Sequence, residues 1–219
     1  MYSIMKKILL SIAAFAVILG TTFIISCTSE DTTKPVITLK GNASVDVVLN
    51  STYTDEGATA TDDNDGDISS SIATTNNVNS NLKGTYTVTY TVSDAAGNSD
   101  TKTRTVNVKN SCENMAGDYD VVDLVAGTPY TYIDNIATSS SVNNRIYVQK
   151  FAAYVNAGVY FDVNGTNITV PQQTYNVGSP AADRTFSGNG TISGTTIVIN
   201  YTEVTNGTTV TGIETYTKK

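Results

Sequence analysis

Acidic residues and tyrosines are the side chains of this sequence that could do chemistry. The chain has no histidine, which excludes Ser-His-Asp and Cys-His nucleophile systems and every zinc site with a histidine ligand. Pairs of carboxylates, as in hydrolases of glycosidic bonds, remain possible, as do Lys, Ser and Tyr side chains. Asp134, Asp162 and Glu203 are the acids that such a hydrolase would use. We expect a protein that is not an enzyme, and we keep the carboxylate-pair hydrolase as an alternative.

An acidic loop in the first half of the chain contains Asp62, Asp63, Asp65 and Asp67. Clustered carboxylates repel one another unless water or a hard cation such as Ca²⁺ separates them. The spacing departs from an EF-hand loop, because Ile68 stands where that loop needs glycine. Two interpretations stay open: these four acids bind calcium, or their side chains cap backbone N–H groups in a turn. The pattern favours the turn, and calcium is the one cofactor that the sequence suggests.

The first residues have the pattern of a secretory signal. Lys6 and Lys7 precede an uncharged, mostly apolar run over residues 8–25, and a basic start before an apolar run is typical of signal peptides. A run of this length could also be a membrane-spanning helix. The residues that follow the run distinguish the two.

The residues after the run are Ile24-Ile25-Ser26-Cys27, which resemble the cleavage box of bacterial lipoproteins. Ile24 stands where leucine is usual, and the small Ser26 lies at the cleavage point. The resemblance implies that residues 1–26 are a signal peptide and that Cys27 carries the lipid.

Residues 27–34 are then a lipidated tether. Several acyl chains on one cysteine give stable anchoring, so the membrane is a partner through the lipid. Ser29-Glu30-Asp31 resembles the acidic signal that directs lipoproteins to the outer face of the outer membrane in some Gram-negative bacteria. We therefore expect an outer-membrane lipid-anchored protein that faces the cell exterior.

Composition limits the remaining partners. The net charge of −7 comes without a basic cluster, which makes the chain a poor binder of nucleic acid. Cys112 is the second cysteine, and it has no disulfide partner once Cys27 is lipidated. We expect Cys112 to be a small packing residue.

The sequence pattern of residues 35–109 is typical of an antiparallel β-sandwich. Residues 85–92 alternate between threonine and Tyr or Val, and residues 103–109 alternate likewise. Such alternation indicates strands with one buried face. The turn-forming residues 94–98 lie between them, and short strands with turns over this length are typical of a sandwich.

This segment also resembles the bacterial Ig-like domain of crystal toxins and surface proteins, close to the hyalin-repeat type. The resemblance implies an Ig-like β-sandwich that serves as a spacer or adhesion module. The residues that carry it are Tyr53-x-Asp55-x-Gly57-Ala58, Asp65-Gly66-Asp67-Ile68, Gly84-x-Tyr86-x-Val88-x-Tyr90, Asp94-x-x-Gly97-Asn98 and Arg104-x-Val106-x-Val108.

Residues 111–219 read as eight strands joined mostly by tight turns. Asn164-Gly165 and Asn206-Gly207 between alternating runs are strong hairpin signals. A meander of this size tends to close into a barrel, so the whole chain is expected to be all-β. The expected strands cover residues 118–124, 130–136, 145–151, 153–163, 167–170, 184–192, 195–202 and 208–217.

The order of motifs in residues 111–219 resembles that of a lipocalin-like domain of surface lipoproteins, a family without a catalytic signature. The matching residues are Gly117-x-Tyr119, Ile168-x-Val170-Pro171-Gln172-Gln173, Ser187-Gly188-x-Gly190-Thr191-Ile192 and Ile199-x-Tyr201.

The second half carries most of the aromatic residues, and a tyrosine offers an apolar face with a hydroxyl at its edge, which suits a sugar. Tyr130 and Tyr132 share one side of a strand next to an expected barrel rim. Gln172, Gln173 and Tyr175 follow Pro171 at an expected strand end. We expect these five residues to bind an extracellular glycan or protein. A barrel that holds a small apolar ligand is the alternative outside catalysis.

Overall fold

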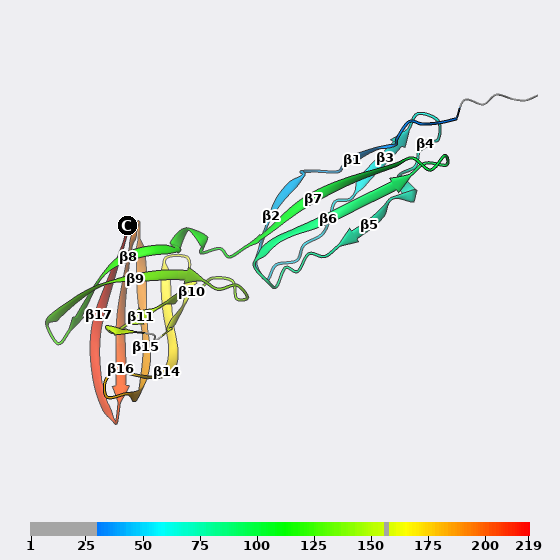
Figure 1. Ribbon diagram of the computed structural model, residues 1–219. Helices are drawn as coiled ribbons and strands as arrows, with labels where there is room; N and C mark the ends of the chain where they lie inside the picture. The colour runs from blue at the N-terminus through cyan, green and yellow to red at the C-terminus, as the bar shows by residue number, and fades with distance from the viewer. Residues whose placement is uncertain (1–29, 156–157) are drawn as a thin grey trace, which may run out of the picture. The chain divides into compact units, whose positions relative to one another are not determined.

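The computed structural model describes residues 30–155 and 158–219, and their regular structure is almost entirely β (Figure 1). Two short 3₁₀ helices, η1 (Ser69–Ser71) and η2 (Glu113–Met115), interrupt the strands. The all-β prediction is confirmed. The expected signal peptide and Cys27 lie outside the described residues. Within those residues, none of the helices has the length and apolar character needed to span a membrane.

Two sheets make up the first domain. One sheet has the order β1-β3-β4 and the other β2-β7-β6-β5. All pairings are antiparallel except that of β2 with β7, which is parallel. The strands are β1 (Val36–Leu39), β2 (Ser44–Val48), β3 (Ala58–Asp62), β4 (Gly66–Asp67), β5 (Ala73–Asn76), β6 (Gly84–Ser93) and β7 (Ser99–Lys109).

The alternation in β6 and β7 produces the core of the sandwich, as the sequence predicted. Val88, Tyr90 and Val92 of β6 are buried, as is Val106 of β7. Ile37 of β1 packs against the same cluster. The threonines between the buried residues of β6 face outward or lie half-buried, so each strand has one apolar face.

An ion pair joins the buried Arg104 to the half-buried Asp55 in the first domain. The Arg104 guanidinium is 1% exposed and donates to Asp55 and to the Asn42 carbonyl. Asp55 also accepts hydrogen bonds from the hydroxyls of Tyr53, at 2.7 Å, and Tyr90. Although burial opposes it, these donors hold the pKa of Asp55 below its usual value. The pair thus joins segments of the first domain that are far apart in the sequence.

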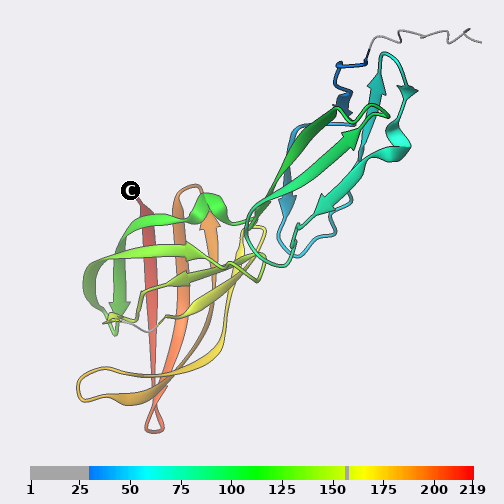
Figure 2. The same ribbon diagram turned by 45° about the vertical axis from the view of Figure 1, so that its right-hand side comes forward.

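Eight antiparallel strands form a closed barrel in the second domain (Figure 2). Each strand pairs with the next barrel strand along the chain, and the last strand, β17, closes the barrel against the first, β8. The strands are β8 (Gly117–Val125), β9 (Thr128–Thr138), β10 (Arg145–Val148), β13 (Tyr160–Asn164), β14 (Asn167–Val177), β15 (Ala182–Ser193), β16 (Thr196–Thr205) and β17 (Thr208–Lys218).

Two details differ from the expected strands. The strand expected over residues 153–163 is wrong, because that segment is divided between the short β12 (Tyr154–Val155) and β13. Pro171 does not end a strand: β14 continues past it to Val177. The register between β14 and β15 shifts between Val170 and Gln173, so a bulge accommodates the proline, which has no N–H to donate.

A hairpin of β11 (Lys150–Phe151) and β12 reaches into the barrel. Phe151 is fully buried, and its ring packs 5.5 Å from that of Phe161 and 5.4 Å from that of Phe186, between ring centroids. The two turn residues, Ala152 and Ala153, have φ values of +51° and +61°. A left-handed conformation costs an L-residue about 1–2 kcal/mol, so contacts with the barrel interior must stabilise this turn.

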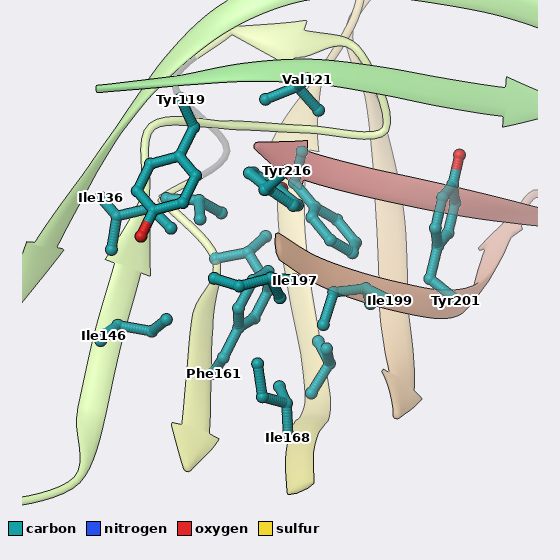
Figure 3. Packing of buried hydrophobic residues seen from close by; sticks show 14 of the residues in the cluster. Tyr119, Val121, Ile136, Ile146, Phe161, Ile168, Ile197, Ile199, Tyr201 and Tyr216 are labelled. Atoms are coloured by element: carbon teal, nitrogen blue, oxygen red, sulfur yellow. The ribbon is translucent and has the colours of Figure 1, made fainter. Parts of the chain in front are cut away.

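The rest of the interior is filled by apolar and aromatic side chains. Figure 3 shows Tyr119, Tyr216 and Phe161 gathered between the strands, with Ile197 and Ile199 beside them. The ring centroids of Tyr119 and Tyr216 lie 6.3 Å apart in an edge-to-face arrangement. The middle of the barrel is therefore a packed core.

The ion pair of Arg104 and Asp55 generates a stability prediction. Asp55→Asn leaves the Arg104 charge buried without its counterion, and we expect the free energy of unfolding of this domain to fall by about 3–5 kcal/mol. The matched control is Asp46→Asn, because Asp46 forms an exposed ion pair with Lys109, and exposed ion pairs contribute little to stability, so we expect a much smaller loss. Urea denaturation of the full-length protein measures both. Equal losses in the two variants would contradict the role assigned to Asp55.

Candidate functional site

A cavity of about 350 Å³ lies at the end of the barrel where the β8–β9 and β16–β17 turns are found. Asp123, Tyr201 and Glu203 contribute polar groups to its wall, and the hairpin turn forms another part of it. Cavities that hold small ligands start at about this size. The full lining is Asp123, Val125, Tyr130, Ala152, Ala153, Tyr154, Arg184, Tyr201, Glu203 and Val210.

Strand alternation brings the polar groups inside. Along β8, Val121 and Asp123 are buried while their neighbours are exposed. Along β16, Ile199 and Tyr201 are buried while their neighbours are exposed or half-buried. Successive inward positions on these strands change from apolar to polar toward the cavity. The barrel interior therefore has an apolar middle and one polar end.

The carboxyl group of Glu214 joins three elements below this cavity. It accepts hydrogen bonds from the Tyr132 hydroxyl, from the Tyr216 hydroxyl at 2.6 Å and from the Ala152 backbone N–H at 2.7 Å. Complete burial raises the pKa of Glu214 to about 8, although the tyrosine hydrogen bonds act in the opposite direction. Glu214 ties the hairpin turn to β9 and β17.

Glu203 and Arg184 form an ion pair in the cavity wall. The Arg184 guanidinium carbon lies 4.4 Å from the centre of the Tyr154 ring, a cation–π distance. Glu203 also accepts a hydrogen bond from the Thr205 hydroxyl at 3.0 Å. Arg184, the single arginine of the wall, is thus already paired with Glu203 and packed against the Tyr154 ring.

Asp123 is fully buried beside this pair. The Tyr201 hydroxyl donates to Oδ1 of Asp123 at 2.9 Å. Gly212 of β17 lies opposite Tyr201 of β16. A Cβ atom at position 212 would clash with the Tyr201 ring, so the glycine leaves room for it. Burial raises the pKa of the Asp123 carboxyl, and the nearby Glu203 charge raises it further.

The structure brings part of the expected ligand-binding set to the cavity. Tyr130 lines the cavity and is 49% exposed, so its ring is available to a ligand. Tyr132 lies on the same side of β9 but deeper, where it is bound to Glu214. The two tyrosines share the predicted strand face, but only Tyr130 reaches the cavity wall.

Gln172, Gln173 and Tyr175 are not part of this cavity wall. Gln172 is exposed, while Gln173 is buried and binds the backbone N–H and carbonyl of Tyr160 at 3.0 and 2.8 Å. The Tyr175 hydroxyl donates to Gln173 at 2.8 Å. The Gln173 side chain therefore joins β14 to β13 beyond Thr169, where the backbone pairing of these two strands ends.

The three acids considered for catalysis lie apart. Asp134 is buried and accepts backbone N–H groups of Asn135, Gln149 and Lys150 at 2.8 to 3.2 Å. Asp162 pairs with Arg145 on β10, across the strand pairing. Of the three acids, Glu203 alone lines the cavity.

Side chains of the acidic loop accept hydrogen bonds from backbone N–H groups. Asp62 accepts the N–H groups of Asn64 and Asp65 at 3.0 Å each, and Asp67 accepts that of Ser69 at 2.9 Å. Asp65 accepts the N–H of Ala95 at 2.7 Å. Asp63 is exposed. These contacts match the turn interpretation, and calcium binding by this loop stays a prediction.

A larger cavity of about 550 Å³ lies beside η2, near the ends of β16 and β17. Two of its polar groups already have partners: the Lys218 ammonium donates to the Asn114 carbonyl at 2.5 Å, and the Tyr119 hydroxyl to the Met115 carbonyl at 2.9 Å. Cys112 in its wall is 4% exposed, and burial raises the pKa of its thiol. We therefore place the candidate site at the smaller cavity, where charged groups converge.

Sequence reasoning missed Asp123, Arg184 and Glu214 as members of the site. A signal for the acids is present: Asp123 follows Val121 at the buried spacing, and Glu214 precedes Tyr216 at the same spacing. A charged residue in the buried register of a strand indicates a polar interior group. Arg184 gave no such signal, because its strand lacks a regular apolar alternation.

Comparisons with known proteins identify the first domain. Residues 37–108 match the family model described as the Ig-like domain of bacterial surface proteins. The resemblance predicted for this segment is confirmed. No curated protein sequence matches the chain.

Among solved structures, the chain is similar to a lipoprotein of Bacteroides thetaiotaomicron, with 18% sequence identity and a TM-score of 0.35. The match covers 83% of this chain and 98% of that chain.

The buried Glu214 generates a prediction about pH. Its folded-state pKa, about 8, exceeds the usual value of 4.5, so the folded state holds a proton that the unfolded state releases between these values. This contribution to stability is complete at low pH and disappears as the pH rises through about 8.

Glu214→Gln keeps the shape of the side chain and removes its ionisable carboxyl group. We expect the variant to gain stability relative to wild type between pH 5 and 8, by up to about 1.4 kcal/mol for each pH unit. Melting temperatures of the two proteins across this range test the idea. Parallel curves for wild type and variant would contradict it.

Proposed function

We propose that this chain is a lipid-anchored protein of the bacterial outer surface whose barrel binds an extracellular sugar in the cavity beside Tyr130. In this proposal Cys27 carries the lipid, the Ig-like domain is the spacer and the barrel is the binding domain. The protein has no catalytic role. The observation that carries the proposal is the combination of tyrosine rings with charged hydrogen-bonding groups in one cavity wall.

The wall chemistry supports a sugar. A sugar ring has an apolar face, which packs on an aromatic side chain, and polar edges, which need donors and acceptors. Tyr130 and Tyr154 supply rings, while Asp123, Arg184 and Glu203 supply charged groups. The volume of about 350 Å³ suits a single sugar unit at the end of a longer glycan.

The same chemistry disfavours a small apolar ligand. Phe151 of the inserted hairpin fills the barrel interior, with its ring centroid 5.1 Å from that of Tyr201. The cavity that remains has charged side chains in its wall, and an apolar molecule would cover their polar atoms without replacing the bonds that they make with water.

The Ig-like match at residues 37–108 supports the spacer and the surface location. A small sandwich between a lipid anchor and a binding domain increases the reach of that domain from the membrane. The acidic residues after Cys27 support the outer face of the outer membrane.

The cavity generates a binding prediction. Tyr130→Ala removes the most exposed ring of the wall, and we expect sugar affinity to fall about tenfold, because a large side chain buried by a ligand contributes roughly 1.5 kcal/mol or more. A glycan array probed with the full-length protein in a polyoxyethylene detergent identifies the sugar, and titration measures the loss.

Tyr147→Ala is the matched control, because Tyr147 is 37% exposed on β10 and lies outside the cavity wall. Equal affinity of the Tyr130 variant and wild type would remove this tyrosine from the site. A wild-type protein that binds no glycan would contradict the proposed function and direct the search to a protein partner.

The anchor has its own test. Metabolic labelling of a Gram-negative host with an alkyne fatty acid should mark the wild-type chain and leave Cys27→Ala unmarked, because the cysteine sulfur is the attachment point. Cys112→Ala is the control and should label as wild type does. Labelling of Cys27→Ala at the wild-type level would sink the lipoprotein assignment.

A further inference from the structure

One carboxylate oxygen in the cavity wall has no partner. Asp123 is fully buried, and the Tyr201 hydroxyl binds its Oδ1 atom. Its Oδ2 atom makes no hydrogen bond. Within the described part of the chain, Asp62 Oδ2 is the other buried side-chain oxygen in this state. Buried polar atoms are nearly always hydrogen-bonded, so an exception in a cavity wall indicates a group that a ligand completes.

The neighbouring charges cannot complete Asp123, because they are already engaged. Arg184 is paired with Glu203 and lies over the Tyr154 ring. Glu214 receives three hydrogen bonds from Tyr132, Tyr216 and the Ala152 backbone. The cavity wall therefore carries two acids, Asp123 and Glu203, against one arginine. Asp123 is therefore the acid without a positive partner, and its Oδ2 atom is the one without a hydrogen bond.

We propose that Asp123 binds the protonated amino group of the ligand, so that the cavity selects an amine-bearing sugar over a neutral one. This inference rests on the proposed function and names its ligand class. An ammonium group donates to Asp123 Oδ2 and supplies the missing positive charge. A neutral hydroxyl can also donate to this carboxylate, but it brings no positive charge to offset the buried acid, so it binds less tightly. An anionic sugar is repelled by Asp123, the acid without a positive partner.

An organic amine fits this cavity better than a bare metal ion. The volume of about 350 Å³ is many times that of one cation, and Val125, Tyr130 and Val210 give the wall apolar surface. A hard metal ion takes six or more oxygen ligands, whereas in the described wall Asp123 Oδ2 is the unpartnered buried side-chain oxygen.

The test compares three ligands by calorimetry on the full-length protein near neutral pH. Glucosamine carries both the ring and the amine, glucose carries the ring alone, and cadaverine carries amines without a ring. We expect glucosamine to bind about 10- to 100-fold more tightly than glucose, the usual range for a charge-assisted hydrogen bond.

Two variants locate the effect. Asp123→Asn keeps the shape of the side chain and should abolish the preference for glucosamine. Asp120→Asn is the matched control on the same strand, where Asp120 is exposed and pairs with Lys219, and it should keep the preference. The ligand comparison in wild type stands by itself if Asp123→Asn fails to fold.

The outcomes separate this inference from the proposed function. Equal affinity for glucosamine and glucose would overturn the amine site and leave the sugar function in place. Cadaverine binding that requires Asp123, without binding of either sugar, would support the amine site and overturn the sugar function. Failure of all three ligands to bind would overturn both.

Discussion

The hydrogen bonds around the buried Glu214 carboxyl hold the inside of the barrel together. Tyr132 comes from β9, Tyr216 from β17 and the Ala152 N–H from the inserted hairpin, and all three donate to this one group. The turn at Ala152 and Ala153 has an unfavourable backbone conformation, so it needs this anchor. The hairpin in turn fills the barrel interior with Phe151 and forms one wall of the cavity.

Two other acids, the half-buried Asp55 and the buried Asp134, show how Asp123 differs. Asp55 has Arg104 and two tyrosine hydroxyls, and Asp134 has backbone N–H groups from two segments. Each of these acids is satisfied by its own domain, and each has a structural role. Asp123 is buried like Asp134 and more deeply than Asp55, but it keeps one oxygen without a donor. Part of the polarity of the cavity therefore comes from an oxygen atom, Asp123 Oδ2, that the fold leaves without a hydrogen bond.

Local alternation in the sequence was sufficient to predict both β domains, because a strand with one buried face repeats every two residues. It placed Tyr130 and Tyr132 on one face correctly. It did not predict the hairpin of residues 150–155, whose contacts with Glu214 and Phe186 join segments far apart in the chain. It also did not predict the hydrogen bonds of Gln173 to Tyr160, since a glutamine that joins two strands has the same local pattern as a surface glutamine.

The pairing of β8 with β17 has a consequence for how the binding domain forms. These two strands are the first and last of the barrel, and their contacts join the most distant parts of the domain. Proteins rich in such non-local contacts fold slowly, since chain entropy must be lost before the contacts form. The hydrogen bonds of Asp123 to Tyr201 and of Glu214 to Tyr132 both cross this seam. A nascent chain therefore acquires the cavity only in the step that closes the barrel, and partly folded forms lack it altogether.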